Sequence, residues 1–190
     1  GFIGTHIVVE LTKAGHDVVS AVRHPVGGGT NAMGCDMVSD IHVEDWLPRL
    51  QGIDVVVNAA GILREFGRNR FDTVHRDAPC ALYRACEQAG IKRVVQISAI
   101  GDPQDMNFIR SKHEGDRCLS SLSIDWVVVR RSVVYAVSCS YGGTSLLRAI
   151  AATPLVLFLP GNGQQTLQPI AATDLGQLVV QLVEGKGGSR

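Results

Sequence analysis

Short apolar runs alternate with helical patterns along this chain, and this alternation is the feature that most constrains its fold. Two of the runs, Val55-Val56-Val57 and Val127-Val128-Val129, are apolar on both faces, which is typical of strands covered by helices on both sides. The expected strands are 18–22, 33–37, 54–58, 93–98 and 126–130, and the expected helices are 5–14, 43–50, 71–89 and 108–122. The order predicts an α/β fold with a doubly wound parallel sheet.

The chain opens on Gly1-Phe2-Ile3-Gly4, directly before the first helical pattern. This resembles the end of a G-x-x-G-x-x-G turn, in which Gly1 lets the backbone approach a pyrophosphate and Gly4 lets the helix pack on its strand. A G-x-x-G before a helix is also an ordinary strand-to-helix turn. Because the motif starts with a strand and a further glycine, we expect both to precede Gly1. The turn predicts a dinucleotide ligand.

Composition excludes several classes of protein. The 18 basic and 18 acidic residues are dispersed and give a formal net charge of zero, so we expect no nucleic-acid partner. The five cysteines are scattered without a C-x-x-C pair, which argues against a disulfide framework or a zinc site and for a reducing, cytoplasmic location. No pair of histidines has metal-binding spacing, and no apolar run is long enough to cross a bilayer. We therefore expect no metal and no membrane segment.

Ligands bind at the carboxyl ends of parallel strands, so the residues that follow each strand are candidates. Arg23 lies about twenty residues past the glycine turn, where an acidic residue would accept from an adenosine ribose 2′-hydroxyl. A guanidinium suits a 2′-phosphate instead and favours NADP over NAD, unless Arg23 is merely a solvated strand-end residue. Asp36, near the end of the next expected strand, is either an adenine contact or a turn residue.

Two later strand ends and one helix carry further candidates. Asn58-Ala59-Ala60-Gly61 closes a strand with small residues that let the backbone approach a cofactor, or it is only a strand-ending turn. Ser98 ends the strand over 93–98, where a hydroxyl would face a bound nicotinamide. Lys112 lies one helical turn after Phe108 and on the same face. A lone helix lysine would otherwise be a solvated residue.

Together these residues resemble the short-chain dehydrogenase/reductase superfamily, in its extended or atypical branch, over nearly the whole chain. Arg130-Arg131-Ser132-Val133-Val134-Tyr135 adds to the resemblance, because it is similar to the branch's R-P-S-x-V-Y-G segment. Residues 57–65, 93–101 and 161–174 are similar to bacterial relatives of the dinucleotide-binding subunit of respiratory complex I, some of which carry a DoxX-like membrane domain, and to NmrA-like proteins.

The resemblance implies one Rossmann domain over residues 1–190 with a small substrate-side region within 136–174. It also implies NADP as the cofactor, with NAD possible, an unknown small-molecule substrate, and a homodimer. The implied cofactor contacts include Gly1 to Gly4, Asn58 to Gly61, Ser98, Lys112, Ser132 and Val133.

The sequence departs from the superfamily pattern at Phe108. Active members use a Tyr-x-x-x-Lys pair in which the tyrosine passes a proton to or from the substrate oxygen. Phenylalanine cannot carry a proton, so a contribution of roughly a hundredfold to ten-thousandfold would be lost. The resemblance leaves Ser98 and Lys112 as the catalytic candidates. Tyr135, Tyr141 and His75 are alternative proton carriers, or packing and surface residues.

Three functions remain open. The first is a weak or specialised NADP-dependent oxidoreductase, favoured by Ser98 and Lys112. The second is a non-catalytic dinucleotide-binding redox sensor or structural subunit, favoured by Phe108. The third, a nucleoside-diphosphate-sugar epimerase, ranks last because it needs the tyrosine and a larger C-terminal lobe than the short span after Tyr135 provides.

Overall fold

A computed structural model describes residues 1–25, 31–136 and 166–186, together with residues 145, 149, 150, 152 and 164. All strand pairs among these residues are parallel. They are β1 (Ser20–Val22) with β2 (Ala32–Gly34), β4 (Arg93–Ala99) between β3 (Val55–Asn58) and β5 (Trp126–Arg131), and β6 (Val134–Tyr135) with β7 (Ile170–Ala171). Because parallel strands share one direction, the carboxyl ends of β3, β4 and β5 meet at one edge.

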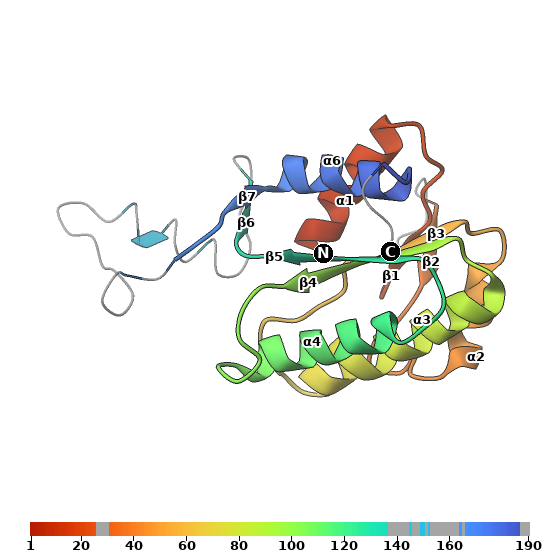
Figure 1. Ribbon diagram of the computed structural model, residues 1–190, viewed down its shortest axis with the longest axis horizontal. Helices are drawn as coiled ribbons and strands as arrows, with labels where there is room; N and C mark the ends of the chain where they lie inside the picture. Colours follow the sequence, from red (N-terminus) through yellow and green to blue (C-terminus); the bar gives the residue numbers. More distant parts are fainter. Residues whose placement is uncertain are drawn as a thin grey trace.

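Helices cover both faces of the sheet that β3, β4 and β5 form (Figure 1). On one side lie α1 (Phe2–Lys13) and α6 (Ala172–Val183), and on the other lie α3 (Ala78–Ala89) and α4 (Asn107–Ser120). The short helix α2 (Val43–Trp46) continues into the 3₁₀ turn η1 (Leu47–Leu50), which packs against α3. The predicted α/β fold with a parallel sheet is confirmed.

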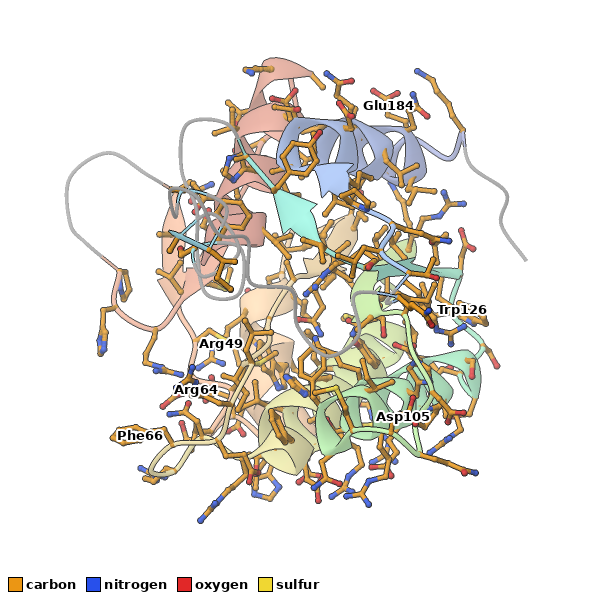
Figure 2. All side chains as sticks on the ribbon, turned by 90° about the vertical axis from the view of Figure 1, so that its left-hand side faces the viewer. Arg49, Arg64, Phe66, Asp105, Trp126 and Glu184 are labelled. Carbon is orange, nitrogen blue, oxygen red and sulfur yellow. A yellow bond between two sulfur atoms is a disulfide. The ribbon has the colours of Figure 1, made fainter. Side chains whose placement is uncertain are left out.

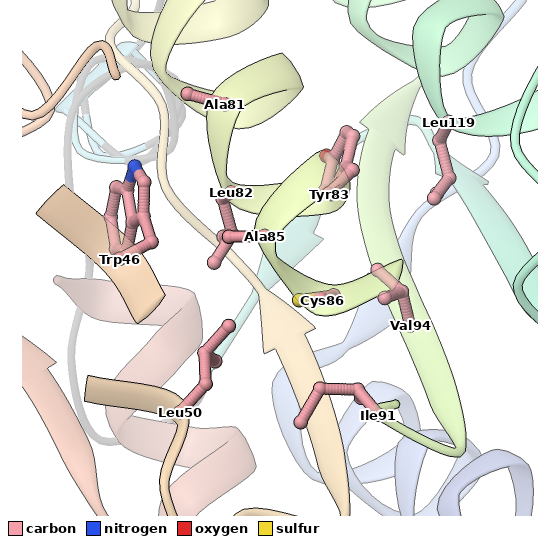
Figure 3. Close-up of a cluster of buried hydrophobic side chains, with 10 residues drawn as sticks. All are labelled: Trp46, Leu50, Ala81, Leu82, Tyr83, Ala85, Cys86, Ile91, Val94 and Leu119. Carbon is pink, nitrogen blue, oxygen red and sulfur yellow. The ribbon is translucent and has the colours of Figure 1, made fainter. Parts of the chain in front are cut away.

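The strand β4 explains why two helical layers are needed. All its residues are buried, and its side chains alternate between two apolar clusters. Val94 joins the cluster under α3 and α4, together with Tyr83 and Leu119, which Figure 3 shows. Val95 and Ile97 join the cluster under α1 and α6. Two successive apolar residues, Val94 and Val95, thus face opposite helical layers, as expected for a strand covered on both faces.

The predicted elements are confirmed within a few residues, with four differences. The strand expected at 33–37 is found three residues long, as β2, and the helix expected at 43–50 divides into α2 and η1. The helix expected at 71–89 contains a π-helical turn, η2 (Thr73–Asp77), before α3, and α3 ends at Gly90 in a left-handed conformation with φ +71°. The helix α6 was not predicted.

The cysteines differ from the sequence expectation. Cys80 of α3 and Cys118 of α4 form a disulfide, with their Cα atoms 5.8 Å apart, so the expectation that no disulfide forms is wrong for this pair. The two residues are 38 positions apart and come together only because the two helices pack side by side, which no local spacing reports. In the described ranges no group of His, Cys, Asp and Glu could hold a metal, and no helix there could span a membrane.

Candidate functional site

The helix α1 begins at Phe2 and its first turn lies beside the loop that follows β3. Gly1 is the N-cap and has no side chain to satisfy the free backbone N–H groups, which are therefore open to an anion. A Cβ at Gly1 would meet no atom within 4 Å, so a ligand can approach the backbone there. A Cβ at Gly4 would lie 3.9 Å from the Ala59 Cβ, an ordinary contact. Packing alone does not require glycine at position 4.

The first-turn side chains Phe2 and Ile3 pack into the protein. Phe2 contacts the apolar cluster of Val134, Ala172 and Leu175, and Ile3 contacts this cluster and the one under α1 and α6. These two residues therefore anchor the N-terminus of α1 at the sheet edge and offer a ligand their backbone, not their side chains.

Asn58 shapes the loop after β3 from a buried position. Its Oδ1 accepts from the Ala60 N–H at 3.1 Å, and its Nδ2 donates to the Tyr83 hydroxyl at 3.0 Å. Tyr83 in turn donates to Gln96 of β4, and both residues are fully buried. Asn58 thus fixes the backbone of residues 58–60 by an Asx turn. Sequence reasoning missed Tyr83 and Gln96, because only the packing of α3 on β4 brings them to Asn58.

Lys112 lies at the centre of the site. It is 2% exposed, and its Nζ donates to the carbonyl of Ala60 at 2.7 Å and lies 3.4 Å from that of Ile97. A Cβ at Gly61 would stand 2.9 Å from this Nζ, so glycine at position 61 leaves room for the lysine. Burial, followed by the positive charge of Arg131, lowers the pKa of Lys112 to about 7, while Asp116 opposes the change. Lys112 and the loop of Asn58 to Gly61 were both candidates from the sequence, and in the structure they contact each other.

His75 stands beside Lys112 in the π-helical turn η2, with both ring nitrogens occupied. Its Nε2 accepts from the Ile62 N–H at 3.0 Å, so the proton lies on Nδ1, which donates to the Ser111 hydroxyl at 2.9 Å. Ser111 then donates to the carbonyl of Phe108 at 3.0 Å. Burial, then the charge of Lys112, lowers the pKa of His75 to about 3. Neutral and saturated, His75 has no free nitrogen for a proton-carrying role.

Phe108 packs against His75 and Phe71 in an aromatic cluster. The ring centroids of Phe108 and His75 are 5.4 Å apart, edge to face, and those of Phe71 and His75 are 5.5 Å apart and stacked. The position of the superfamily tyrosine therefore holds an apolar contact one turn before Lys112 on α4.

Ser98 is fully buried under α4 and not directed to open space. Its hydroxyl donates to Asp116 Oδ2 at 2.8 Å, and Arg130 donates to the same oxygen at 3.1 Å. Asp116 is 3% exposed and was missed, because its contacts depend on α4 lying over β4 and β5. In this arrangement Ser98 has no hydroxyl hydrogen free for a ligand.

Arg23 and Asp36 follow β1 and β2 and contact each other. Arg23 Nε lies 3.3 Å from Asp36 Oδ1, and another nitrogen of Arg23 donates to Asn69 Oδ1 at 3.1 Å. Arg23 is half exposed, and the Asp36 carboxylate also accepts from the Val38 N–H at 3.2 Å. Asn69 belongs to the exposed loop that Arg64 and Phe66 mark in Figure 2.

The segment after β5 pairs with the segment before α6. Ser132 Oγ accepts from the Gln168 N–H at 3.5 Å and the Val133 carbonyl accepts from Ile170 at 2.9 Å, which joins β6 to β7. Tyr135, on β6, is 44% exposed. Tyr141 and residues 160–163 lie outside the described residues, while Asp174 lies in the first turn of α6.

A parallel sheet with helices on both faces, and with a helix N-terminus and a buried lysine at its carboxyl edge, defines a dinucleotide-binding α/β protein. The chain belongs to the NAD(P)H-binding family, whose model matches residues 1–138. The chain therefore contains an NAD(P)H-binding domain.

The chain is similar to one curated relative and to several solved structures. Ceramide reductase of Caulobacter vibrioides is 27% identical over 139 residues, which cover 71% of this chain but only 44% of that protein. UDP-N-acetylglucosamine 4-epimerase from Bacillus cereus has a TM-score of 0.76 at 19% identity, covering 97% of this chain and 71% of that one. The oxidoreductase ylbE from Lactococcus lactis has a TM-score of 0.67 at 18% identity, covering 97% and 81%. These structural likenesses show the shared fold.

Proposed function

We propose that this chain binds NADP(H) at the carboxyl edge of its sheet and serves as the cofactor-binding part of a reductase. The observation that carries the proposal is Lys112, held by the Ala60 carbonyl at 2.7 Å and buried between α4 and the loop after β3. A lysine so placed can donate to a ribose hydroxyl, while the N-terminus of α1 receives a pyrophosphate. NADPH, when bound, supplies the hydride, and the protein binds and orients it.

The preference for NADP over NAD rests on Arg23. Its half-exposed guanidinium keeps donors available beside Asp36, and a bidentate contact with a 2′-phosphate suits it. We expect Arg23→Ala to weaken NADPH binding roughly tenfold or more, the scale of one lost charge-assisted hydrogen bond, and to leave NADH binding unchanged. Calorimetric titration with both dinucleotides measures this. Equal losses for the two would contradict the role of Arg23 in selecting the phosphate.

The relative named ceramide reductase supports reductase activity for this chain. Phe108 argues against it, because phenylalanine cannot transfer a proton to the substrate. The Phe108 ring is only partly buried, so we expect Phe108→Tyr to place a hydroxyl one helical turn before Lys112, where it can serve as the missing proton donor. If the rest of the site is competent, the rate of NADPH oxidation with a panel of carbonyl compounds, including ketolipids, rises between about a hundredfold and ten-thousandfold.

The matched control is Phe71→Tyr, which adds a hydroxyl to the other phenylalanine of the same cluster but not next to Lys112 on α4. An equal rise in both variants would argue against a defined proton-donor position at residue 108. If Phe108→Tyr reduces none of the carbonyl compounds tested, the result would argue against reductase chemistry.

The second candidate is a dinucleotide-binding module without catalysis. It is favoured by the internal hydrogen bonds of the polar groups, since Ser98 is bound to Asp116 and His75 to Ile62 and Ser111. It predicts NADPH binding by the wild-type chain and no turnover by either the wild type or Phe108→Tyr.

A further inference from the structure

Among the residues that the structure describes, Arg131 at the end of β5 has no carboxylate partner. Its Nε is buried without a hydrogen bond, and its Nη1 donates to the carbonyl of the neighbouring Ser132 at 3.3 Å. Among the described residues it forms no ion pair, and the remaining residues include no aspartate or glutamate. A half-buried guanidinium without a counter-charge costs stability unless a ligand satisfies it.

The preceding residue, Arg130, shows the contrast within one strand. Arg130 is half exposed and its Nε lies 3.1 Å from Asp116 Oδ2, a carboxylate that also accepts from Ser98. Two successive arginines therefore differ in that one has its counter-charge inside the protein and the other does not. Asp116 Oδ2 is already shared by two donors.

Arg131 also lies close to a second buried cation. It stands opposite Ala99 in the register of β4 and β5, and Lys112 contacts the carbonyl of Ile97, two residues earlier on β4. The charge of Arg131 lowers the pKa of Lys112, and burial lowers the pKa of Arg131 itself. Burial therefore disfavours the charged form of both side chains, the charge of Arg131 adds to this effect at Lys112, and a negative group nearby would stabilise both cations.

We propose that Arg131 is the donor of a subsite for an anionic oxygen group, a carboxylate or a phosphate, at the carboxyl ends of β4 and β5, with the charge of Lys112 nearby. The group belongs either to the dinucleotide or to the substrate. The proposal rests on the proposed function only for the identity of this ligand. The Arg131 guanidinium lacks a carboxylate partner among the described residues whether or not a dinucleotide binds.

Sulfate is a suitable probe, because it keeps two negative charges across the working pH range. The unfolding temperature of the chain is measured in sodium sulfate and in sodium chloride of equal ionic strength, for the wild type, Arg131→Met and Arg130→Met. We expect sulfate to raise the unfolding temperature of the wild type and Arg130→Met by several degrees more than that of Arg131→Met. General salt effects act on all three proteins alike and cancel in this comparison.

Equal sulfate increments in the three proteins would overturn the proposal and leave only a general effect of sulfate. Should Arg131→Met not fold, Arg131→Lys takes its place, because it keeps the charge but loses the two-pronged donor. We then expect sulfate to raise the unfolding temperature of Arg131→Lys by less than that of the wild type. An equal rise in the two proteins would contradict the subsite.

Saturating NADPH separates the two sources of the anion. If the Arg131-dependent increment disappears, the subsite holds a phosphate of the cofactor. If the increment persists, the subsite remains open for an anionic group of the substrate. If NADPH does not bind while the increment is present, the proposed function fails and the anion subsite stands.

Discussion

His75 illustrates how the residues of this site are bound to one another before any ligand arrives. It accepts from Ile62 and donates to Ser111, so it fixes the loop after β3 to α4 through one imidazole. Only the neutral ring can do both, since a protonated ring has no acceptor. The stability of the site therefore depends on pH.

In the folded protein the pKa of His75 is about 3, and its ordinary value is 6.5. Between these values the unfolded chain binds the proton and the folded chain does not, so acid favours unfolding. We expect the wild type to lose stability as the pH falls from 6.5 toward 3, and His75→Gln to lose less over the same range. Urea unfolding at several pH values measures the difference. Parallel curves for the two proteins would show that His75 takes up a proton without cost.

At the scale of elements, the contact between α4 and η2 holds His75 and Lys112 together. A Cβ at Gly115 of α4 would overlap the backbone carbonyl oxygen of His75. The helix and the π-helical turn approach so closely only because residue 115 has no side chain. Substitution here tests the element packing directly.

We expect Gly115→Ala to lower the free energy of unfolding by about 2 kcal/mol, because overpacking against backbone costs about 1–3 kcal/mol and exceeds the gain in helix propensity. The matched control is Gly4→Ala in α1, another helical glycine, whose Cβ would lie at an ordinary 3.9 Å from the Ala59 Cβ. That variant should lose clearly less stability in chemical denaturation. A stable Gly115→Ala would mean that the two elements can separate without cost.

The sequence predicted the elements better than the contacts. Apolar runs such as Val127 to Val129 mark strands that are covered on two faces. A run of this kind is a local feature of the sequence, so it was enough to locate the strands. The helix α6 was missed, although Leu175, Val179 and Leu182 form a buried stripe at helical spacing. The π-helical turn at His75 has no periodic signal of its own.

The candidate site was predicted in outline but not in its hydrogen bonds. Lys112 and the loop of Asn58 to Gly61 were proposed from strand ends and helical spacing, and the structure brings them together. Asp116 and Tyr83 could not be proposed, because their partners lie on other elements and only the packing of α3 and α4 on β4 defines them. Tertiary contacts of this kind leave no pattern in one sequence.

At the scale of the whole molecule, the two helical layers place three sources of positive potential at one edge of the sheet. The N-terminus of α1 comes from one layer, Lys112 of α4 from the other, and Arg131 from the end of β5 between them. A ligand with several negative charges matches this arrangement, and a dinucleotide is such a ligand. We therefore expect the chain to bind NADPH at this edge through Lys112.

Calorimetric titration of NADPH into the wild type and Lys112→Met measures the contribution of this lysine to binding. The methionine removes a buried charge and keeps most of the side-chain volume, so the variant should fold, as circular dichroism can verify. We expect roughly micromolar binding of NADPH by the wild type and at least tenfold weaker binding by Lys112→Met. Equal affinities in the two proteins, or no binding by the wild type, would contradict this expectation.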